Sequence, residues 1–428
     1  MARRDPRQTC TRRFTVTSFR LSLCGFLCIA FFLLPPIVSA DDFTSVARTL
    51  VPLNEARREA ALVAIAADGE IHFRSGEGDR RLRPNELVSW GAPAEPRSDA
   101  QLLLTDGGTI NIRKNPAPTT DQERIVVLSD TFGELKLPLT RVAGVMLHAP
   151  IDPQRRDALA ARLRGPRQDA GDTTLRRNTD RLLLENGDEL TGRMIALTET
   201  AVEFEAEIGP LTVEMERIAA LALNPSLRST TADEKPRCLI GFADGSVLAA
   251  KELKFNDGRL EASLAGMTAP LAVDAEPVFL QPLGDHVQYL SDLTPAGYRH
   301  LPYLSVSYGY QLDANVDGTR LRAGGRLSAK GVGMHSAARL TWQLEKPYRR
   351  FQADLAIDDQ TGGRGSVVFR VFSGAREIYK SPVIRGGDAP TAISIDVREV
   401  RQLSLVVDYA DRGGMLDHAD WLNARLVP

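Results

Sequence analysis

The stretch Ser366-Val-Val-Phe-Arg-Val-Phe has the length and the β-branched and aromatic content of a β-strand. Two more segments of the last third of the chain share this character. Ile393-Ser-Ile-Asp-Val alternates as a half-buried strand does, and Leu403-Ser-Leu-Val-Val-Asp-Tyr is a second β-rich run. Loops rich in Asp, Gly and His separate such runs, and short strands with turn signals are typical of a sandwich. The sequence therefore predicts a β-sandwich over residues 285–428.

A change in aromatic content marks the start of this region. All eight tyrosines lie between Tyr289 and Tyr409, and two of the three tryptophans, Trp342 and Trp421, follow residue 288 as well. The first 288 residues contain no tyrosine. We therefore expect a domain boundary near residue 285, with separate cores on its two sides.

Before this boundary, one short pattern occurs four times: an apolar run, an Asp-Gly or Asn-Gly pair, and a second apolar run. The copies span residues 64–71, 102–110, 182–190 and 239–247. Such a turn predicts a β-hairpin because Asn and Gly tolerate the positive φ that a tight turn needs. We expect two β repeat modules in residues 41–150 and two in 180–284. Each has about five short strands and resembles small Sm-like or SH3-like barrels in architecture, which implies no function.

Residues 151–179 lie between the second and third modules. Asp152-Pro153 and Gly165-Pro166 bracket a short predicted helix, with Asp at the N-cap, Pro at the first position and Gly after the end. Its arginines, Arg155, Arg156, Arg162 and Arg164, are expected on a solvated face, because only Leu159 and Leu163 form an apolar stripe. The polar residues that follow are interpreted as a linker.

Residues 1–40 have the layout of a signal peptide. Six arginines and one aspartate precede an apolar run from Leu21 to Val38, and Val-Ser-Ala follows at a cleavage position after Ala40. The alternative is an uncleaved membrane anchor. We expect cleavage, export to the periplasm, the cell envelope or the medium, and no membrane span afterwards.

Removing this leader leaves 47 basic and 54 acidic residues, a formal net charge of −7. An acidic protein is a poor nucleic-acid binder, so no nucleic-acid partner is expected. Cys238 is then the one remaining cysteine, and its apolar surroundings predict a buried, inert thiol.

The sequence contains no HExxH, P-loop, GxGxxG or GxSxG motif, and no CxxC after residue 40. These motif absences favour a non-catalytic protein with no cofactor. A hydrolase active site within residues 41–284 stays an alternative, since a glycosidase needs only two suitably spaced carboxylates.

Four motifs follow one another in the last third of the chain. They are Gly331–Leu344, Phe351–Asp359, Gly365–Phe372 and Asp417–Leu426. This succession resembles the NPCBM family of carbohydrate-binding modules. In other proteins such modules are attached to glycoside hydrolase family 98 enzymes and to some α-galactosidases. The resemblance covers residues 289–428. It implies a jelly-roll sandwich similar to galactose-binding domains and recognition of glycans, often of the galactose type.

Sugars are bound by an aromatic face stacked on the ring and by carboxylate, His and Arg side chains that take the hydroxyls. Seven residues of the motifs have these chemistries and are the candidate ligand-binding residues: His335, Asp358, Asp359, Asp417, His418, Asp420 and Trp421. Structural alternatives stay open for all of them. The histidines could bond core carbonyls, Asp358 and Asp359 could form turns, and Trp421 could be a core residue.

Asp313 and Asp317 lie in an irregular, oxygen-rich loop and are candidate ligands for a structural calcium ion. A further alternative concerns the whole domain: its sandwich could have lost sugar binding and serve contacts with other proteins of the cell envelope.

Overall fold

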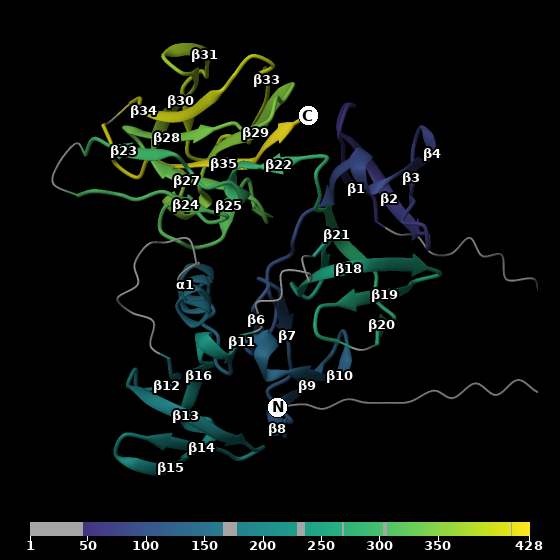
Figure 1. Cartoon of the computed structure of the whole chain (residues 1–428), viewed down its shortest axis with the longest axis vertical. Coiled ribbons are helices and arrows are strands. Elements are labelled where there is room, and N and C mark those ends of the chain that lie inside the picture. The colour runs from purple at the N-terminus through teal and green to yellow at the C-terminus, as the bar shows by residue number, and fades with distance from the viewer. Residues whose placement is uncertain (1–45, 166–177, 229–235, 268, 303–305, 412) are drawn as a thin grey trace, which may run out of the picture. The chain divides into compact units, whose positions relative to one another are not determined.

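The computed structural model describes residues 46–165, 178–228, 236–267, 269–302, 306–411 and 413–428. These residues fold mainly as antiparallel β-strands, as the sequence predicts, with a single α-helix among them (Figure 1). The predicted signal peptide lies outside this described part. None of the helices in the described part is long and apolar enough to cross a membrane.

The four repeat modules follow one another along the chain. The first contains β1 (Arg48–Pro52), β2 (Arg58–Ile65), β3 (Ile71–Ser75), β4 (Gly78–Leu82), the 3-10 helix η1 (Pro84–Glu86) and β5 (Leu87–Gly91). The second contains β6 (Gln101–Leu104), β7 (Thr109–Asn111), β8 (Thr119–Asp121), β9 (Arg124–Ser129), β10 (Gly133–Pro138), η2 (Leu139–Arg141) and β11 (Val142–Met146).

The third module contains β12 (Asp180–Leu184), β13 (Glu189–Leu197), β14 (Ala201–Ala206), β15 (Gly209–Glu214), η3 (Met215–Arg217) and β16 (Ile218–Ala222), and η4 (Pro225–Leu227) follows it. The fourth contains β17 (Cys238–Phe242), β18 (Val247–Asn256), β19 (Arg259–Leu264), β20 (Leu271–Val273) and β21 (Pro277–Pro282).

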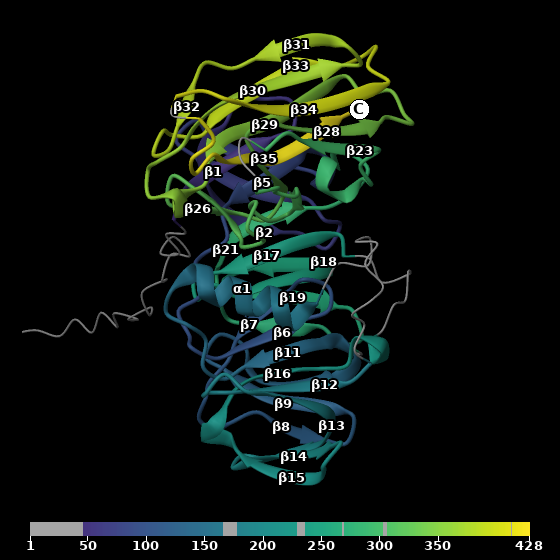
Figure 2. The ribbon, with the colours of Figure 1, turned by 90° about the vertical axis from the view of Figure 1, so that its left-hand side faces the viewer.

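The first strand of each module pairs with both the second and the last strand, so each sheet folds back on itself. The last strands also pair between modules. β5 pairs with β21, and β11 pairs with β16, so the first module joins the fourth and the second joins the third (Figure 2). Most strands of the four modules therefore belong to one continuous sheet, whereas β8, β9 and β10 of the second module form a separate three-stranded sheet.

The four repeated turns have the predicted backbone conformation, but they do not all lie at the same position in their modules. Gly69, Gly107, Gly187 and Gly245 have φ values of +85°, +91°, +90° and +91°. Three of these turns join the first and second strands of a module, whereas the turn at Gly69 joins the second and third. Treating residues 64–71 as an equivalent fourth copy is therefore wrong. The pattern identifies a tight turn, but it carries no information on which turn of the module it is.

The predicted helix is α1 (Pro153–Arg164). The Asp152 carboxylate accepts a hydrogen bond from Arg155 N at 2.8 Å, and Gly165 ends the helix with φ +76°. The solvated arginine face is only partly correct, because Arg156 is 7 % exposed and the neighbouring Asp157 is 6 % exposed. Their burial follows from ion pairs with residues far along the chain, described below.

The C-terminal region is the predicted sandwich. Its first sheet has the order β24-β27-β35-β29-β33, with β22 on β35, and its second has β23-β28-β34-β30-β31, with β32 on β30. The bounds are β22 (Gln288–Tyr289), η6 (Leu290–Asp292), β23 (Gly297–His300), β24 (Gln311–Leu312), β25 (Leu321–Ala323), β26 (Arg326–Ser328), β27 (Gly331–His335), β28 (Ala338–Gln343), β29 (Arg350–Ile357), η7 (Asp359–Thr361), β30 (Ser366–Ser373), β31 (Arg376–Lys380), β32 (Ile384–Arg385), β33 (Thr391–Asp396), β34 (Gln402–Tyr409) and β35 (His418–Val427).

The modules and the sandwich each have a large apolar core of their own. One of the smaller clusters crosses the expected boundary and contains Val88, Val287, Tyr289 and Val427. Cys238 is buried as predicted, and desolvation raises the pKa of its thiol to about 12. A thiol with that pKa is inert.

Candidate functional site

Three strands of the first sheet bring the motif residues to one end of the sandwich. β35 runs antiparallel to both β27 and β29, so the end of β27, the start of β35 and the end of β29 meet. His335, the last residue of β27, lies directly opposite His418, the first residue of β35. Asp358 follows β29 and donates its N–H to the carbonyl of His418 at 2.9 Å. Residues more than 80 positions apart in the chain thus share this end.

Four rings form a cluster here: His300, Tyr308, His335 and His418, which we term the histidine cluster. Tyr308 stacks on His335 with ring centroids 4.0 Å apart and an angle of 3° between the planes. The rings of His300 and His418 lie 6.0 and 5.9 Å from that of His335. His335 and His418 are only 5 % and 8 % exposed, whereas Tyr308 and His300 are half-buried. The two motif histidines therefore form the floor of the cluster and the other two rings its accessible part.

Burial keeps these histidines neutral. Desolvation lowers the pKa of His335 to about 4, and the neighbouring His418 and His300 add to this effect. Desolvation also lowers the pKa of His418 and of His300. A neutral imidazole offers one N–H donor and one acceptor nitrogen, which suits it to a hydroxyl group that both donates and accepts.

Gln360 and Asp317 place polar atoms beside the cluster. Gln360 Nε2 lies 2.8 Å from His418 Nδ1 and donates to Asp317 Oδ2 at 2.9 Å. The Asp317 carboxylate is also 3.4 Å from His418 Nδ1, and its side chain is 46 % exposed. An accessible carboxylate and a half-buried amide thus stand next to an imidazole that is almost fully buried.

The loop that carries Asp317 is held by Asn315, which is fully buried. Its side chain donates to Thr319 Oγ1 at 2.7 Å and accepts from the N–H groups of Asp317 and Thr319 at 3.2 and 3.0 Å. Gly333 of β27 makes room for this loop, because a Cβ there would lie 2.5 Å from the carbonyl oxygen of Ala314. The presence of glycine at position 333 in the first motif therefore has a local steric reason.

Asp358 and Asp359 have the turn-forming role that the sequence left open. Asp358 is 1 % exposed and accepts from Gln360 N at 2.9 Å and from Arg322 N at 3.1 Å. Asp359 accepts from the N–H groups of Gly324 and Gly325 at 3.0 and 2.8 Å. Both carboxylates hold neighbouring loops in place, so their contacts are structural.

Asp417 and Asp420 are fully buried. Asp417 accepts from Ser366 N at 2.9 Å, and desolvation raises the pKa of its carboxyl to about 6. Desolvation, followed by the charge of the neighbouring Asp358, raises the pKa of Asp420 far above its usual value. Neither group has an exposed surface for a ligand.

A family model described as the NPCBM/NEW2 domain matches residues 286–427. These residues form an NPCBM/NEW2 domain. An α-1,3-galactosidase B from Akkermansia muciniphila is 37 % identical over 117 residues, and a protein from Renibacterium salmoninarum named as an endo-α-N-acetylgalactosaminidase is 30 % identical over 114 residues. The matches cover 26 % and 27 % of this chain, but only 15 % and 8 % of those proteins.

A solved structure of a CBM51 module from Clostridium perfringens GH95, in complex with methyl-galactose, is 22 % identical. It covers 33 % of this chain and 99 % of its own, with a TM-score of 0.30.

Trp421 does not lie on the surface of the NPCBM/NEW2 domain. It is 0 % exposed, and its ring packs edge-on against Phe369 at 4.9 Å and tilted against Phe351 at 6.2 Å. Its selection as a ligand-binding residue is therefore wrong, because neither face of the indole is open to a sugar. The alternative, a core tryptophan, is correct.

The two candidate calcium ligands are engaged in other contacts. Asp313 accepts from Lys330 Nζ at 2.9 Å and from Gly331 N at 3.2 Å, so a lysine neutralises it. Asp317 belongs to the group around His418. Within the described ranges, no three His, Cys, Asp or Glu side chains gather as a metal site would require. The structure therefore offers no support for a calcium ion held by Asp313 and Asp317.

The sequence interpretation missed Tyr308, His300 and Gln360. None of them lies in the four motifs, and their neighbours in the cluster come from distant strands. One available signal was the aromatic pair Tyr308-Gly-Tyr310, since loops beside a rigid sandwich tend to carry binding residues.

Proposed function

We propose that this protein is an exported, non-catalytic glycan-binding protein whose NPCBM/NEW2 domain recognises a galactose-type sugar at the histidine cluster. The family of the domain supports glycan binding. The names of the two relatives, a galactosidase and an N-acetylgalactosaminidase, favour galactose-type sugars. Because this chain covers only a small part of either relative, their activities are not carried over to it.

One observation carries the proposal: the neutral His335–His418 pair lies beside the exposed Asp317 carboxylate and under the half-buried ring of Tyr308. In this site Asp317 accepts a hydrogen bond from a sugar hydroxyl, and the Gln360 side chain forms a hydrogen bond with a neighbouring hydroxyl. An edge or face of Tyr308 packs on the apolar side of the sugar ring. This is the chemistry of a shallow lectin-like site.

The carboxyl groups at this end support binding rather than hydrolysis. Glycosidases place two carboxyl groups about 5–10 Å apart on either side of the scissile bond. Here Asp358, Asp417 and Asp420 are buried, and backbone N–H groups donate to Asp358 and Asp417. Asp317, in contrast to these three residues, is accessible, with 46 % of its side chain exposed.

Export is proposed from the first 40 residues alone, whose basic, apolar and small-residue segments stand in the order of a signal peptide. Mass spectrometry of the protein recovered from outside the cytoplasm should give an N-terminus at Asp41. A mature form that retains Leu21 would contradict cleavage.

A glycan array probed with the purified protein tests the proposal. We expect signal on terminal galactose or N-acetylgalactosamine and none on matched glucose-terminated glycans, with a Kd on the order of 10 µM to 1 mM. No signal on any glycan would contradict the proposal and favour the alternative, a sandwich that serves protein contacts. Hydrolysis of the printed glycans would instead contradict the non-catalytic part.

A further inference from the structure

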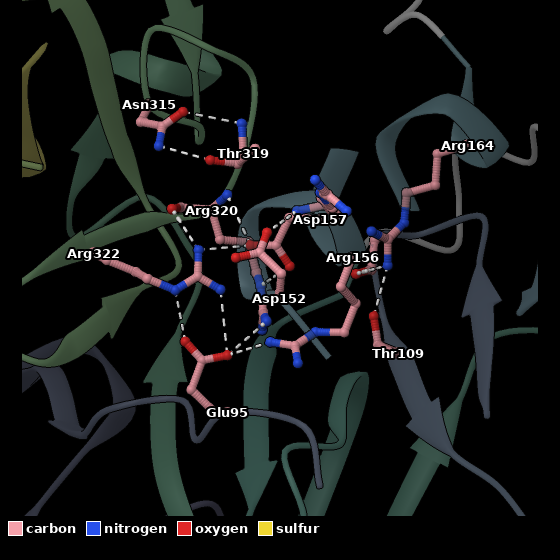
Figure 3. A network of polar contacts seen from close by, with 12 residues as sticks. Glu95, Thr109, Asp152, Arg156, Asp157, Arg164, Asn315, Thr319, Arg320 and Arg322 are labelled. Carbon is pink, nitrogen blue, oxygen red and sulfur yellow. Dashed lines mark hydrogen bonds and ion pairs between the residues drawn. The ribbon is translucent and has the colours of Figure 1, made fainter. Parts of the chain in front are cut away.

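A network of ion pairs joins the repeat modules to the NPCBM/NEW2 domain (Figure 3). From the module side come Glu95, which lies between β5 and β6, and Arg156 and Asp157 of α1. From the domain side come Arg320 and Arg322, at the start of the β25–β26 hairpin. Arg322 contacts both carboxylates, Glu95 through Nε at 2.6 Å and Asp157 through Nη1 at 2.6 Å.

The other arginines complete this network. Arg320 Nε lies 2.9 Å from Asp157 Oδ1, and Arg320 Nη2 lies 3.1 Å from Glu95 Oε2. Arg156 Nη2 contacts the same Glu95 oxygen at 2.6 Å. Three guanidinium groups thus surround two carboxylates, and each carboxylate accepts from more than one arginine.

The network is shielded from water only in part. The exposed fractions of the side chains of Asp157, Arg156 and Arg322 are 5 %, 8 % and 13 %, whereas those of Arg320 and Glu95 are 33 % and 45 %. Burial alone would raise the pKa of Glu95, but its hydrogen bond to Arg322 and the nearby positive charges lower it, so Glu95 stays ionised. Ion pairs that are shielded from solvent are screened much less than surface pairs, which here applies to the Arg322–Asp157 pair.

One series of hydrogen bonds, through Asp358, connects the network to the histidine cluster. The backbone N–H of Arg322 donates to Asp358 Oδ2, and Asp358 Oδ1 accepts from the N–H of Gln360. The Gln360 side chain then contacts both Asp317 and His418. Asp359 holds the tip of the same hairpin at Gly324 and Gly325.

A second route runs along the loop before the hairpin. Arg320 directly follows Thr319, and the Asn315 side chain binds both Thr319 and the backbone of Asp317. A shift of Arg320 or Arg322 therefore displaces Asp317 and Gln360, the two polar side chains that flank His418.

We propose that Glu95 and Arg322 are positioning residues for the glycan site, so that the repeat modules set the geometry of Asp317, Gln360 and His418 through the β25–β26 hairpin. The inference rests on the proposed function for its ligand, but the coupling itself is a property of the protein without a ligand. Glu95 contacts none of the three site residues, so it acts on the site only through the two arginines.

The test compares Glu95→Gln with Arg57→Gln in the full protein. Arg57 is a matched control because it also joins a module to the domain, through Asp354 Oδ1 at 2.5 Å and Oδ2 at 2.8 Å. Asp354 lies within β29, whereas the carboxylates that hold the hairpin, Asp358 and Asp359, follow the end of that strand. Two readouts are used: the ¹H–¹³C resonances of the His418 ring, assigned among the six histidines with a His418→Gln sample, and the Kd for a methyl galactoside.

Glu95→Gln should shift the His418 resonances and weaken the Kd by about fivefold or more, the size typical of coupling between linked sites. Arg57→Gln should leave both unchanged. Unchanged His418 resonances in Glu95→Gln, or equal shifts in the two variants, would overturn the inference. If Glu95→Gln does not fold, Arg322→Lys takes its place with the same expected results. Absence of galactoside binding by the wild type would defeat the proposed function alone, since the resonances still report the coupling.

Discussion

The repeat modules and the NPCBM/NEW2 domain bury polar side chains in different ways. In the modules, buried charges have partners: Arg141 pairs with Asp106 at 3.0 Å, and Asp180 accepts from the N–H groups of Met194 and Asn224, both at 2.7 Å. At one end of the domain, by contrast, burial drives Asp417 and His335 towards their neutral forms. Burying the charged form of an ionisable group without an opposite charge is costly, so the group becomes neutral instead, and groups with such shifted pKa values are concentrated at functional sites. This contrast supports the proposal that the modules are a scaffold and that this end of the domain binds the ligand.

The largest effect expected within this comparison is that of Trp421→Ala. Removing a fully buried tryptophan from the domain core should lower the free energy of unfolding by about 3–5 kcal/mol. Urea unfolding followed by tryptophan fluorescence and circular dichroism measures it. If the variant kept wild-type stability and lost only sugar binding, Trp421 would be a ligand residue and its placement in the core would be wrong.

A smaller effect depends on pH and concerns Asp417. The pKa of Asp417 is about 6 in the folded state, above the value of about 3.8 expected when unfolded, so the folded state binds more protons between these pH values. Its contribution to stability therefore falls as pH rises from about 4 to 6. Asp417→Asn removes this loss, so the stability of the variant relative to wild type should rise over that window by on the order of 2–3 kcal/mol.

Chemical unfolding of both proteins at several pH values measures this difference. The wild-type curve alone is a poor test, because the pKa of His335 is about 4 in the folded state and its contribution therefore rises with pH over a similar window. A difference between variant and wild type that stays constant from pH 4 to 6.5 would mean that Asp417 is ionised in the folded protein.

The smallest effect separates two equivalent turns of the modules. Gly187 and Gly245 share φ values near +90°, but a Cβ at Gly187 meets nothing within 4 Å, whereas one at Gly245 would lie 2.4 Å from Pro96 Cα. Gly187→Ala should cost about 1 kcal/mol for the left-handed backbone, and Gly245→Ala about 1 kcal/mol more. Equal melting temperatures for the two variants would contradict the close packing of the fourth module on residues 95 and 96.

The sequence predicts those parts of the fold that depend on local patterns. Asp152 and Gly165 define the ends of α1, because caps act on backbone groups of the same helix. The motifs around His335 and His418 meet at one end of the sandwich, where the two residues are paired. Local patterns fail where contacts are distant. The burial of Asp157 depends on Arg320, 163 residues away, and the stacking of Tyr308 on His335 depends on how the strands are paired.

The most direct test of the account is the Kd of Asp317→Asn for a methyl galactoside, measured by titration calorimetry. Asp317 flanks His418, whereas Asp396 is an exposed acid paired in register with Arg350, at the opposite end of β29 from Asp358, and provides the matched control. Loss of one charged hydrogen-bond partner costs about 1.5–3 kcal/mol, so Asp317→Asn should weaken binding by roughly tenfold or more. Asp396→Asn should bind as the wild type does. Equal affinity of Asp317→Asn and wild type, with binding intact, would place the glycan site elsewhere and contradict the account.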